Sequence, residues 1–174
     1  MFIDIWLKET NEMTDNKAAV TNGIFPIGEE NNAYAQFFVG QSYLKTLVAD
    51  PNVNVGVGNV TFEPGTRNNW HIHHDGFQIL LVTAGEGWYQ EAGQPAQKIK
   101  AGDVVVTHDG VKHWHGATKD SWLSHIAITA GTPEWLEPVS LAQLLCEFQR
   151  DWNRTETVPG FVQLMVEAGY FLNM

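Results

Sequence analysis

The sequence predicts an all-β domain, either a sandwich or a small barrel, followed by a short helical segment. Three observations predict this fold class. Short apolar runs alternate with polar residues at the period of two that is typical of strands. Glycine, proline or aspartate separates each run from the next. No long segment with a helical period lies between the runs, which argues against a parallel α/β sheet.

The expected strands fill most of the chain from residue 34 to residue 130. The alternation is clearest where Val53, Val55 and Val57 alternate with asparagine and glycine. The runs that we expect to form strands are 43–48, 53–62, 77–84, 87–91, 104–107 and 122–129.

The pattern becomes helical after the last of these runs. Ser140, with Gln143 three residues later, has the signature of a capping box, and apolar residues then recur on one helical face. A second short helix is expected over 161–168. Cys146 lies in the first helix and is the single cysteine, so no disulfide can form within the chain.

The chain has 174 residues, of which 44% are hydrophobic and 17% charged, as in an ordinary folded protein rather than a disordered one. We divide it into three parts. Residues 1–33 are polar and acidic and are expected to form an N-terminal arm, and residues 34–132 form the β domain. Residues 133–174 form the helical segment, packed on the β domain or on a dimer partner.

Charge and hydropathy argue against two classes of partner. Ten Lys and Arg stand against 20 Asp and Glu, which gives a formal net charge of −10. The basic residues are scattered, so no basic face is available for nucleic acid or an anionic membrane. No apolar run has the length of a membrane span, and the first residues lack the pattern of a signal peptide. We therefore expect a cytoplasmic protein that binds neither nucleic acid nor membranes.

The histidines indicate a metal site, because all seven lie between positions 71 and 125. His71 and His73 are two residues apart, so a strand places both imidazoles on one face, about 7 Å apart at the Cα atoms. Two imidazoles on one face can share a metal ion. A third ligand must come from another part of the chain, and Gln78 and His113 are the candidates.

The spacing of these residues resembles the first motif of the cupin superfamily. That motif contains two glycines, two histidines and a glutamate at fixed intervals. With glutamine in place of the glutamate, it is reproduced by Gly65, His71, His73, Gln78 and Gly85. The turn at Asp75 and Gly76 can reset the strand alternation, so that the histidines and the glutamine face the same way.

The second cupin motif also occurs, in the expected order. It is matched by Gly102, Gly110 and His113, with His108 in place of the usual proline, and the resemblance covers roughly residues 53–130. It implies a double-stranded β-helix, the jelly-roll barrel of the cupins. It also implies one divalent metal ion, either manganese, iron, nickel or zinc, held inside the barrel by His71, His73, Gln78 and His113.

Glutamine at position 78 has a chemical consequence. Three neutral imidazoles and a neutral amide leave the charge of the ion uncompensated. Such a centre should attract anions and carbonyl oxygens more strongly, acidify bound water more and hold the metal less tightly. A mixed nitrogen and oxygen donor set does not decide among the four metals.

Within the cupins, the chain resembles the cupin domain often fused to carboxymuconolactone decarboxylase and the small manganese-dependent hydroxynitrile lyases. The similar segments are 69–73, 78–88, 113–117 and 124–128. The decarboxylase partner is absent from this chain. Those lyases have three residues between the second histidine and the glutamine, whereas this chain has four.

The resemblance implies that His115 and His125 lie near the substrate, with His125 as the suspected base. On a strand, His115 shares a face with His113. An imidazole titrates near working pH and can move a proton. The alternative is that either histidine only orients a ligand. His74 is expected at the surface, and His108 in a turn or at the rim.

We therefore expect a metal-binding cupin, an enzyme that acts on a small oxygenated organic molecule by metal-assisted acid/base chemistry of the lyase type. Two alternatives stay open. One is a metal-dependent dioxygenase, which the missing carboxylate at position 78 disfavours. The other is a cupin without catalytic activity that binds a sugar or metabolite. The resemblance also implies a homodimer.

Overall fold

In the computed structural model, the structure is described for residues 17–140. Its elements are β1 (Glu29–Glu30), the 3-10 helix η1 (Asn32–Phe37), β2 (Phe38–Val39), β3 (Ser42–Val48), β4 (Gly56–Phe62), β5 (Arg67–Asn68), β6 (His71–Glu91), β7 (Gln97–Lys100), β8 (Val104–Thr107), β9 (His113–Ala117) and β10 (Leu123–Trp135). The helices expected over 141–152 and 161–168, with Cys146, lie outside the described residues.

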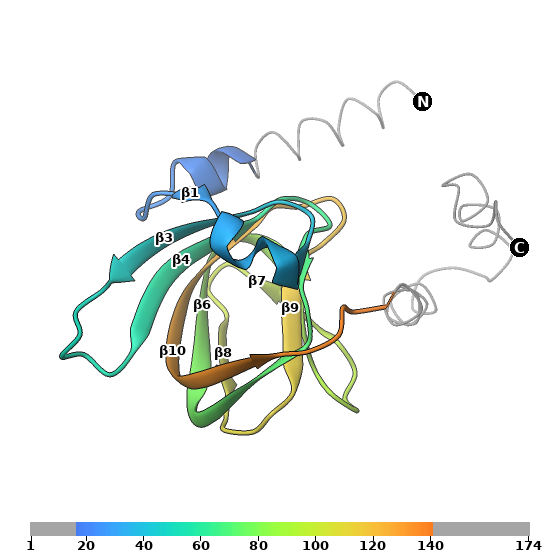
Figure 1. Cartoon of the computed structure of the whole chain (residues 1–174). Coiled ribbons are helices and arrows are strands. Elements are labelled where there is room, and N and C mark those ends of the chain that lie inside the picture. Colours follow the sequence, from blue (N-terminus) through green and yellow to red (C-terminus); the bar gives the residue numbers. More distant parts are fainter. Residues whose placement is uncertain (1–16, 141–174) are drawn as a thin grey trace, which may run out of the picture. The chain divides into compact units, whose positions relative to one another are not determined.

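The strands form one curled sheet, which confirms the all-β prediction (Figure 1). The order of neighbouring strands is β1-β3-β4-β10-β6-β9-β5-β2, and β7 and β8 each pair with β6. Several neighbours in the sheet, such as β4 and β10, are distant in the chain, as in a jelly roll. None of the helices in residues 17–140 is long and apolar enough to cross a membrane.

Each expected run corresponds to an observed strand, but the bounds differ, and β7 and β9 were not among the expected runs. β6 begins at His71, and β10 continues to Trp135. The runs 77–84 and 87–91 belong to one long strand, β6, which continues between them. β4 begins at Gly56, three residues later than expected, because the residues before it form a turn. In that turn the backbone N–H of Asn52 donates to Oδ1 of Asp50 over 2.9 Å.

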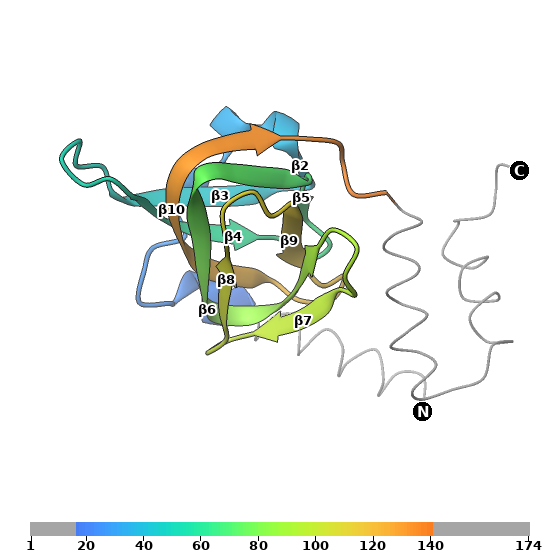
Figure 2. The same ribbon diagram turned by 90° about the horizontal axis from the view of Figure 1, so that it is seen from below.

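β6 connects the two halves of the sheet. Its first half pairs with β10, where Gln78 lies opposite Thr129. Its last residues pair with β9, where Glu91 lies opposite His113. The first residue of β6, His71, also lies opposite His113. The sheet therefore curls round an interior, which is visible when the molecule is seen from below (Figure 2).

A β-bulge in β6 changes which side chains face the interior. His71 and His73 are buried at odd positions, whereas from Gln78 to Ala84 the buried residues are at even positions. Between them Asp75 has a φ of 55°, and the register with β10 shifts at Gly131. The extra residue resets the alternation as expected, by a bulge rather than a turn. One strand can therefore present both histidines and the glutamine to the interior.

Replacing Gly131 with alanine should destabilise the protein more than the matched replacement of Gly93. Both glycines have a φ of 79°. A Cβ at position 131 would lie 2.2 Å from the carbonyl oxygen of His74, whereas one at position 93 would have no neighbour within 4 Å. The left-handed backbone should cost each variant about 1 kcal/mol in urea unfolding, and Gly131→Ala should lose clearly more. Equal losses of unfolding free energy in the two variants would show that the β-bulge can accommodate a methyl group at position 131.

Apolar packing supports the interior next to the histidines. The main core cluster consists of Phe62, Leu80, Val82, Tyr89, Ile99, Ala117, Leu123 and Ala127. A second cluster joins Val20 to Ala84 and Trp122, and it fastens the segment before β1 to the sheet. Nearby, the side-chain amide of Asn59 donates to the carbonyl oxygen of Pro26 over 2.9 Å.

Candidate metal centre

Five of the seven histidines are buried inside the curled sheet. They come from three strands, and they are His71, His73, His113, His115 and His125. The other two, His74 and His108, are exposed, as the sequence predicted. His74 pairs with Glu134 over 2.6 Å at the surface. An imidazole buried without partners is costly, so five of them together require an explanation.

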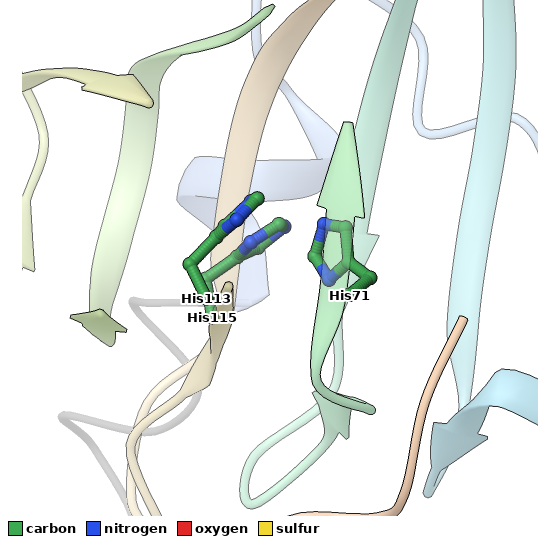
Figure 3. Close-up of side chains that lie close together, drawn as sticks. All are labelled: His71, His113 and His115. Atoms are coloured by element: carbon green, nitrogen blue, oxygen red, sulfur yellow. The ribbon is translucent and has the colours of Figure 1, made fainter. Parts of the chain in front are cut away.

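His71, His113 and His115 come closest to one another. Each offers a ring nitrogen, and the three nitrogens lie within 4.8 Å of one another. Figure 3 shows His113 and His115 on β9, with their rings one beside the other and directed toward His71 on β6. The pairing of His71 with His113 in the sheet accounts for this approach. Three imidazoles at this spacing could hold a metal ion.

The other two expected ligands lie beside these rings. The ring centroid of His73 is 5.3 Å from that of His71 and 5.7 Å from that of His113. Oε1 of Gln78 is 3.0 Å from Nε2 of His113. The four side chains predicted to bind the metal thus occupy one region. Their role as ligands stays a prediction.

Two backbone carbonyls orient the rings of His71 and His113. Nδ1 of His71 lies 3.1 Å from the carbonyl oxygen of Asn69, and Nδ1 of His113 lies 3.0 Å from that of Val111. A carbonyl oxygen can only accept, so each Nδ1 carries the proton in these contacts. The lone pair of each neutral ring is then on Nε2. In metal sites, a hydrogen bond from the ring nitrogen that does not bind the metal commonly fixes the orientation of a histidine ligand.

The remaining donor atoms of these side chains are suited to bind a divalent cation. Nε2 of His71 and both ring nitrogens of His73 are buried and have no hydrogen-bond partner among residues 17–140. With its proton on Nδ1, His113 turns the lone pair of Nε2 toward Oε1 of Gln78, which is also an acceptor. A cation accepts electron pairs from all of these atoms at once. Nitrogen and neutral oxygen donors suit manganese, iron, nickel and zinc.

Burial keeps these imidazoles in the neutral form that binds metals. It lowers the pKa of His71 well below its ordinary value, and the neighbouring His113 lowers it further. It also lowers the pKa of His113 to about 4. Burial and the adjacent His74 lower the pKa of His73. Protons therefore do not compete with a metal ion for these rings near neutral pH.

The two histidines predicted to be catalytic, His115 and His125, lie side by side, and His115 also belongs to the group with His71 and His113. The rings of His115 and His125 meet edge to face, with centroids 4.9 Å apart. The ring of Phe62 packs against both, at 5.7 Å from His115 and 5.6 Å from His125. Neither ring nitrogen of His125 has a hydrogen-bond partner within the described part of the chain. Burial lowers the pKa of His125 to about 3, so its ring is neutral.

A cavity of about 360 Å³ gives these side chains access to a small molecule. Its lining includes polar groups from Asn68, His71, His73, Gln78, His115 and His125. Apolar residues also line it, among them Phe38, Leu44, Val57, Val60, Ala127 and Trp135. The cavity can therefore contact both a polar group and a hydrocarbon group of a ligand.

Comparison with known proteins agrees with this architecture. The family described as the cupin domain matches residues 58–129. The (R)-mandelonitrile lyase of Granulicella tundricola is 40% identical over 111 residues, which are 61% of this chain and 84% of that protein. This chain is a cupin.

Solved structures support the same assignment. A cupin-like protein from Thermotoga maritima is 45% identical to this cupin, with a TM-score of 0.64, over 69% of this chain and 92% of that one. A structure described as a predicted oxalate decarboxylase from the same organism is 24% identical, with a TM-score of 0.51, over 55% of this chain and 84% of that one. The similarity to this second structure supports the fold only.

Two residues of the cavity wall were not predicted from the sequence of this cupin. Trp135 stacks on His71 with centroids 4.7 Å apart and on Phe37 at 4.8 Å. It reaches the site because the pairing of β10 with β6 sets it opposite His71. Asn68 contacts His115 from β5. The sequence around Asn68 did not predict this contact, because the contact joins residues of two different strands.

The cupin without metal should lose stability in mild acid because His125 is buried in its neutral form. The pKa of His125 is about 3 in the folded protein and near 6.5 in the unfolded chain. As the pH falls below 6.5, the unfolded chain takes up the proton first, so stability falls with pH down to about 3. This residue should contribute a loss of about 2 kcal/mol between pH 7 and pH 5.

Urea unfolding of the metal-free protein at these two pH values tests this expectation. The variant His125→Phe should lose about 2 kcal/mol less than the unmodified protein over the same range. The control His108→Ala removes an exposed imidazole and should keep the original pH dependence. A His125→Phe variant as sensitive to acid as the unmodified chain would contradict the assignment.

Proposed function

We propose that this cupin is a metal-dependent lyase that cleaves a small oxygenated organic molecule by acid/base chemistry, and that a cyanohydrin is the substrate class to test first. The observation that carries the proposal is that the ring of His125 lines the same cavity as His71, His73 and Gln78, with neither nitrogen hydrogen-bonded to any of residues 17–140. The named activity of the 40% identical relative, (R)-mandelonitrile lyase, supports the choice of a cyanohydrin.

In this proposal the metal ion is held by Nε2 of His71 and His113, a ring nitrogen of His73 and the amide oxygen of Gln78. The free lone pairs and the carbonyl contacts of His71 and His113 support this ligand set. When bound, a divalent cation supplies Lewis acidity toward a substrate oxygen. Manganese, iron, nickel and zinc are all compatible with the donor atoms.

His125 is the group that we assign to proton transfer. In cyanohydrin cleavage, the hydroxyl proton moves to a ring nitrogen of His125 and the C–O bond becomes a carbonyl. The C–C bond breaks, and its electron pair leaves on cyanide. Cyanide then takes the proton from His125 and departs as hydrogen cyanide. The negative charge that develops beside the ring offsets the cost of a buried imidazolium.

His115 is the second candidate for proton transfer in this proposal. Its ring contacts that of His125, and both line the cavity. The apolar residues that line the same cavity would bind the hydrocarbon group of the substrate. This arrangement would also keep water from the reacting atoms.

Turnover of mandelonitrile tests the proposal directly. The purified protein should release benzaldehyde, which is followed by ultraviolet absorbance. Dialysis against a chelator should reduce the rate at least about 100-fold. Adding back one of manganese, iron, nickel or zinc should restore it, and elemental analysis of the protein purified without added metal identifies the native ion.

Other outcomes would support the alternative functions. Oxygen consumption by the iron-loaded protein with phenolic substrates would indicate a dioxygenase. Tight binding of a metabolite without turnover would indicate a binding protein. The homodimer and the cytoplasmic location expected from the sequence stay predictions, and light scattering of the purified protein would test the former.

A further inference from the structure

Among the described residues, the cavity has one buried side chain besides the histidines whose hydrogen bonds are incomplete. This side chain is Asn31, which lines the cavity and is 7% exposed. Its Nδ2 donates to Oγ of Ser42 over 3.3 Å, and its Oδ1 has no hydrogen-bond partner among residues 17–140. A buried amide oxygen without a partner is costly, so a ligand that completes its hydrogen bonds would gain binding energy here.

The side chain of Asn31 does not cap the helix that follows it. Asn31 stands at the N-cap of η1, where the oxygen of an asparagine commonly accepts a backbone N–H of the first turn. Here the side chain makes no such hydrogen bond. The backbone N–H of Asn31 donates to the carbonyl oxygen of Ser42 over 2.9 Å, which holds the residue beside β3. The amide is therefore fixed in place without being used by the helix.

The amide of Asn31 is on the same side of the sheet as the catalytic candidate His125. Its partner Ser42 lies opposite Phe62 in the pairing of β3 with β4, and the side chains of opposite residues share a face. The ring of Phe62 packs against that of His125, with centroids 5.6 Å apart. Because Asn31 and His125 line one cavity, a single ligand can place one group at the histidines and another at Asn31.

The lining of the cavity disfavours a charged group at Asn31. None of the described residues that line it is Asp, Glu, Lys or Arg. Burial lowers the pKa of the histidines in the lining, which are therefore neutral near neutral pH. A charged group of the ligand would lose its hydration at Asn31 and find no opposite charge there. The group that pairs with the amide is therefore neutral.

A hydroxyl group meets the remaining requirement. With Nδ2 bonded to Ser42, Oδ1 of Asn31 needs a donor. If the amide were flipped end for end, the hydroxyl of Ser42 would donate to Oδ1, and the NH₂ group would need an acceptor instead. An ether or ketone oxygen cannot donate, and an ammonium group cannot accept. A hydroxyl does both, so it satisfies the amide in either orientation.

We infer that Asn31 is a specificity-determining residue that binds a second, neutral hydroxyl group of the substrate. This hydroxyl is distinct from the oxygen that reacts at the metal, and the hydrocarbon part of the molecule carries it. The inference rests on the proposed function only in taking this cavity as the substrate site. It narrows the substrates expected of this cupin to hydroxylated molecules.

Binding of small aldehydes by the full chain tests this inference without turnover. The probes are 3- and 4-(hydroxymethyl)benzaldehyde and their counterparts of nearly equal size, 3- and 4-ethylbenzaldehyde, in which a methyl group replaces the hydroxyl. Isothermal titration calorimetry gives the dissociation constants. At least one hydroxymethyl isomer should bind about tenfold more tightly than its ethyl counterpart, as one completed hydrogen bond allows. If neither isomer binds more tightly, the inference is overturned.

Variants at two adjacent asparagines separate the amide of Asn31 from the rest of the cavity. Asn31→Leu has nearly the same size but no polar side-chain atom, so it should remove the preference for the hydroxymethyl aldehyde. The matched control Asn32→Leu makes the same change at an exposed residue outside the cavity lining and should keep the preference. If Asn31→Leu does not fold, Asn31→Ala gives the same comparison. A preference that survives loss of the amide contradicts the role of Asn31.

Kinetics give a second readout on the cyanohydrin of the preferred hydroxymethyl aldehyde. Asn31→Leu should raise KM about tenfold and leave kcat within about twofold, because the hydroxyl bound by Asn31 takes no part in bond cleavage. A general disturbance of the site would lower kcat as well, and it would affect mandelonitrile, which lacks the second hydroxyl, to the same extent.

Failure of this inference can be told apart from failure of the proposed function. Cleavage of mandelonitrile with no preference for a hydroxymethyl aldehyde contradicts the role of Asn31 alone. A preference that depends on Asn31, with no cleavage of any cyanohydrin, supports this role and contradicts the lyase activity. Absence of binding by all four aldehydes overturns the inference whatever the reaction.

Discussion

Replacing His113 with alanine is expected to abolish metal binding. Elemental analysis after dialysis should find about one ion per chain in the unmodified protein and less than about a tenth of that in the variant. The physical reason is that the chain orients the Nε2 lone pair of His113 toward Gln78 by tying Nδ1 to the carbonyl of Val111. Alanine removes the donor atom and leaves the amide of Gln78 without this neighbour.

The matched control for this variant is His108→Ala, which removes an exposed imidazole from the turn before β9. Its metal content should equal that of the unmodified protein. A His113→Ala variant that retains the full complement of metal would remove His113 from the ligand set. Circular dichroism of each variant would show whether the fold survives the substitution.

Replacing His125 with asparagine is expected to reduce kcat for the lyase reaction about 10²- to 10⁴-fold while the metal content stays unchanged. The expectation follows from the position of His125, which lines the cavity and whose ring nitrogens have no hydrogen-bond partner in the described part of the chain. Asparagine is polar and can occupy part of the space, but it cannot accept and return a proton near neutral pH.

The control is His74→Asn, which makes the same chemical change at an exposed histidine on the opposite side of β6. Its kcat should stay within about twofold of the unmodified value, as expected for a surface substitution. Full activity of His125→Asn would exclude the base role. In that event the same substitution at His115 becomes the next test, because the two rings are in contact.

Much of the fold and of the candidate site could be predicted because both depend on local patterns. Strand alternation and turn residues located most of the longer strands, including the one that carries His125, but β9, which carries His113 and His115, was not among the expected runs. Motif spacing selected His71, His73, Gln78 and His113, which the structure brings into one region. The sequence also predicted that the strand alternation changes at Asp75 and Gly76, before Gln78.

Other features could not be predicted from local patterns. β6 continues through two expected runs because its two halves pair with different strands. Trp135 stacks on His71 through a pairing between residues far apart in the chain. The local sequence around Trp135 resembles that of any strand end, and it carries no sign of this contact.

By itself, the sequence of this cupin determined the kinds of side chain that the site contains and the strands that carry them. These depend on alternation and spacing over a few residues. Only the tertiary structure decided which residues meet: His71 with His113, and the side-chain amide of Asn68 with the ring of His115. The physical reason is that these contacts cross between strands that are distant in the chain. Their register is set by the whole curled sheet and not by any one segment of it.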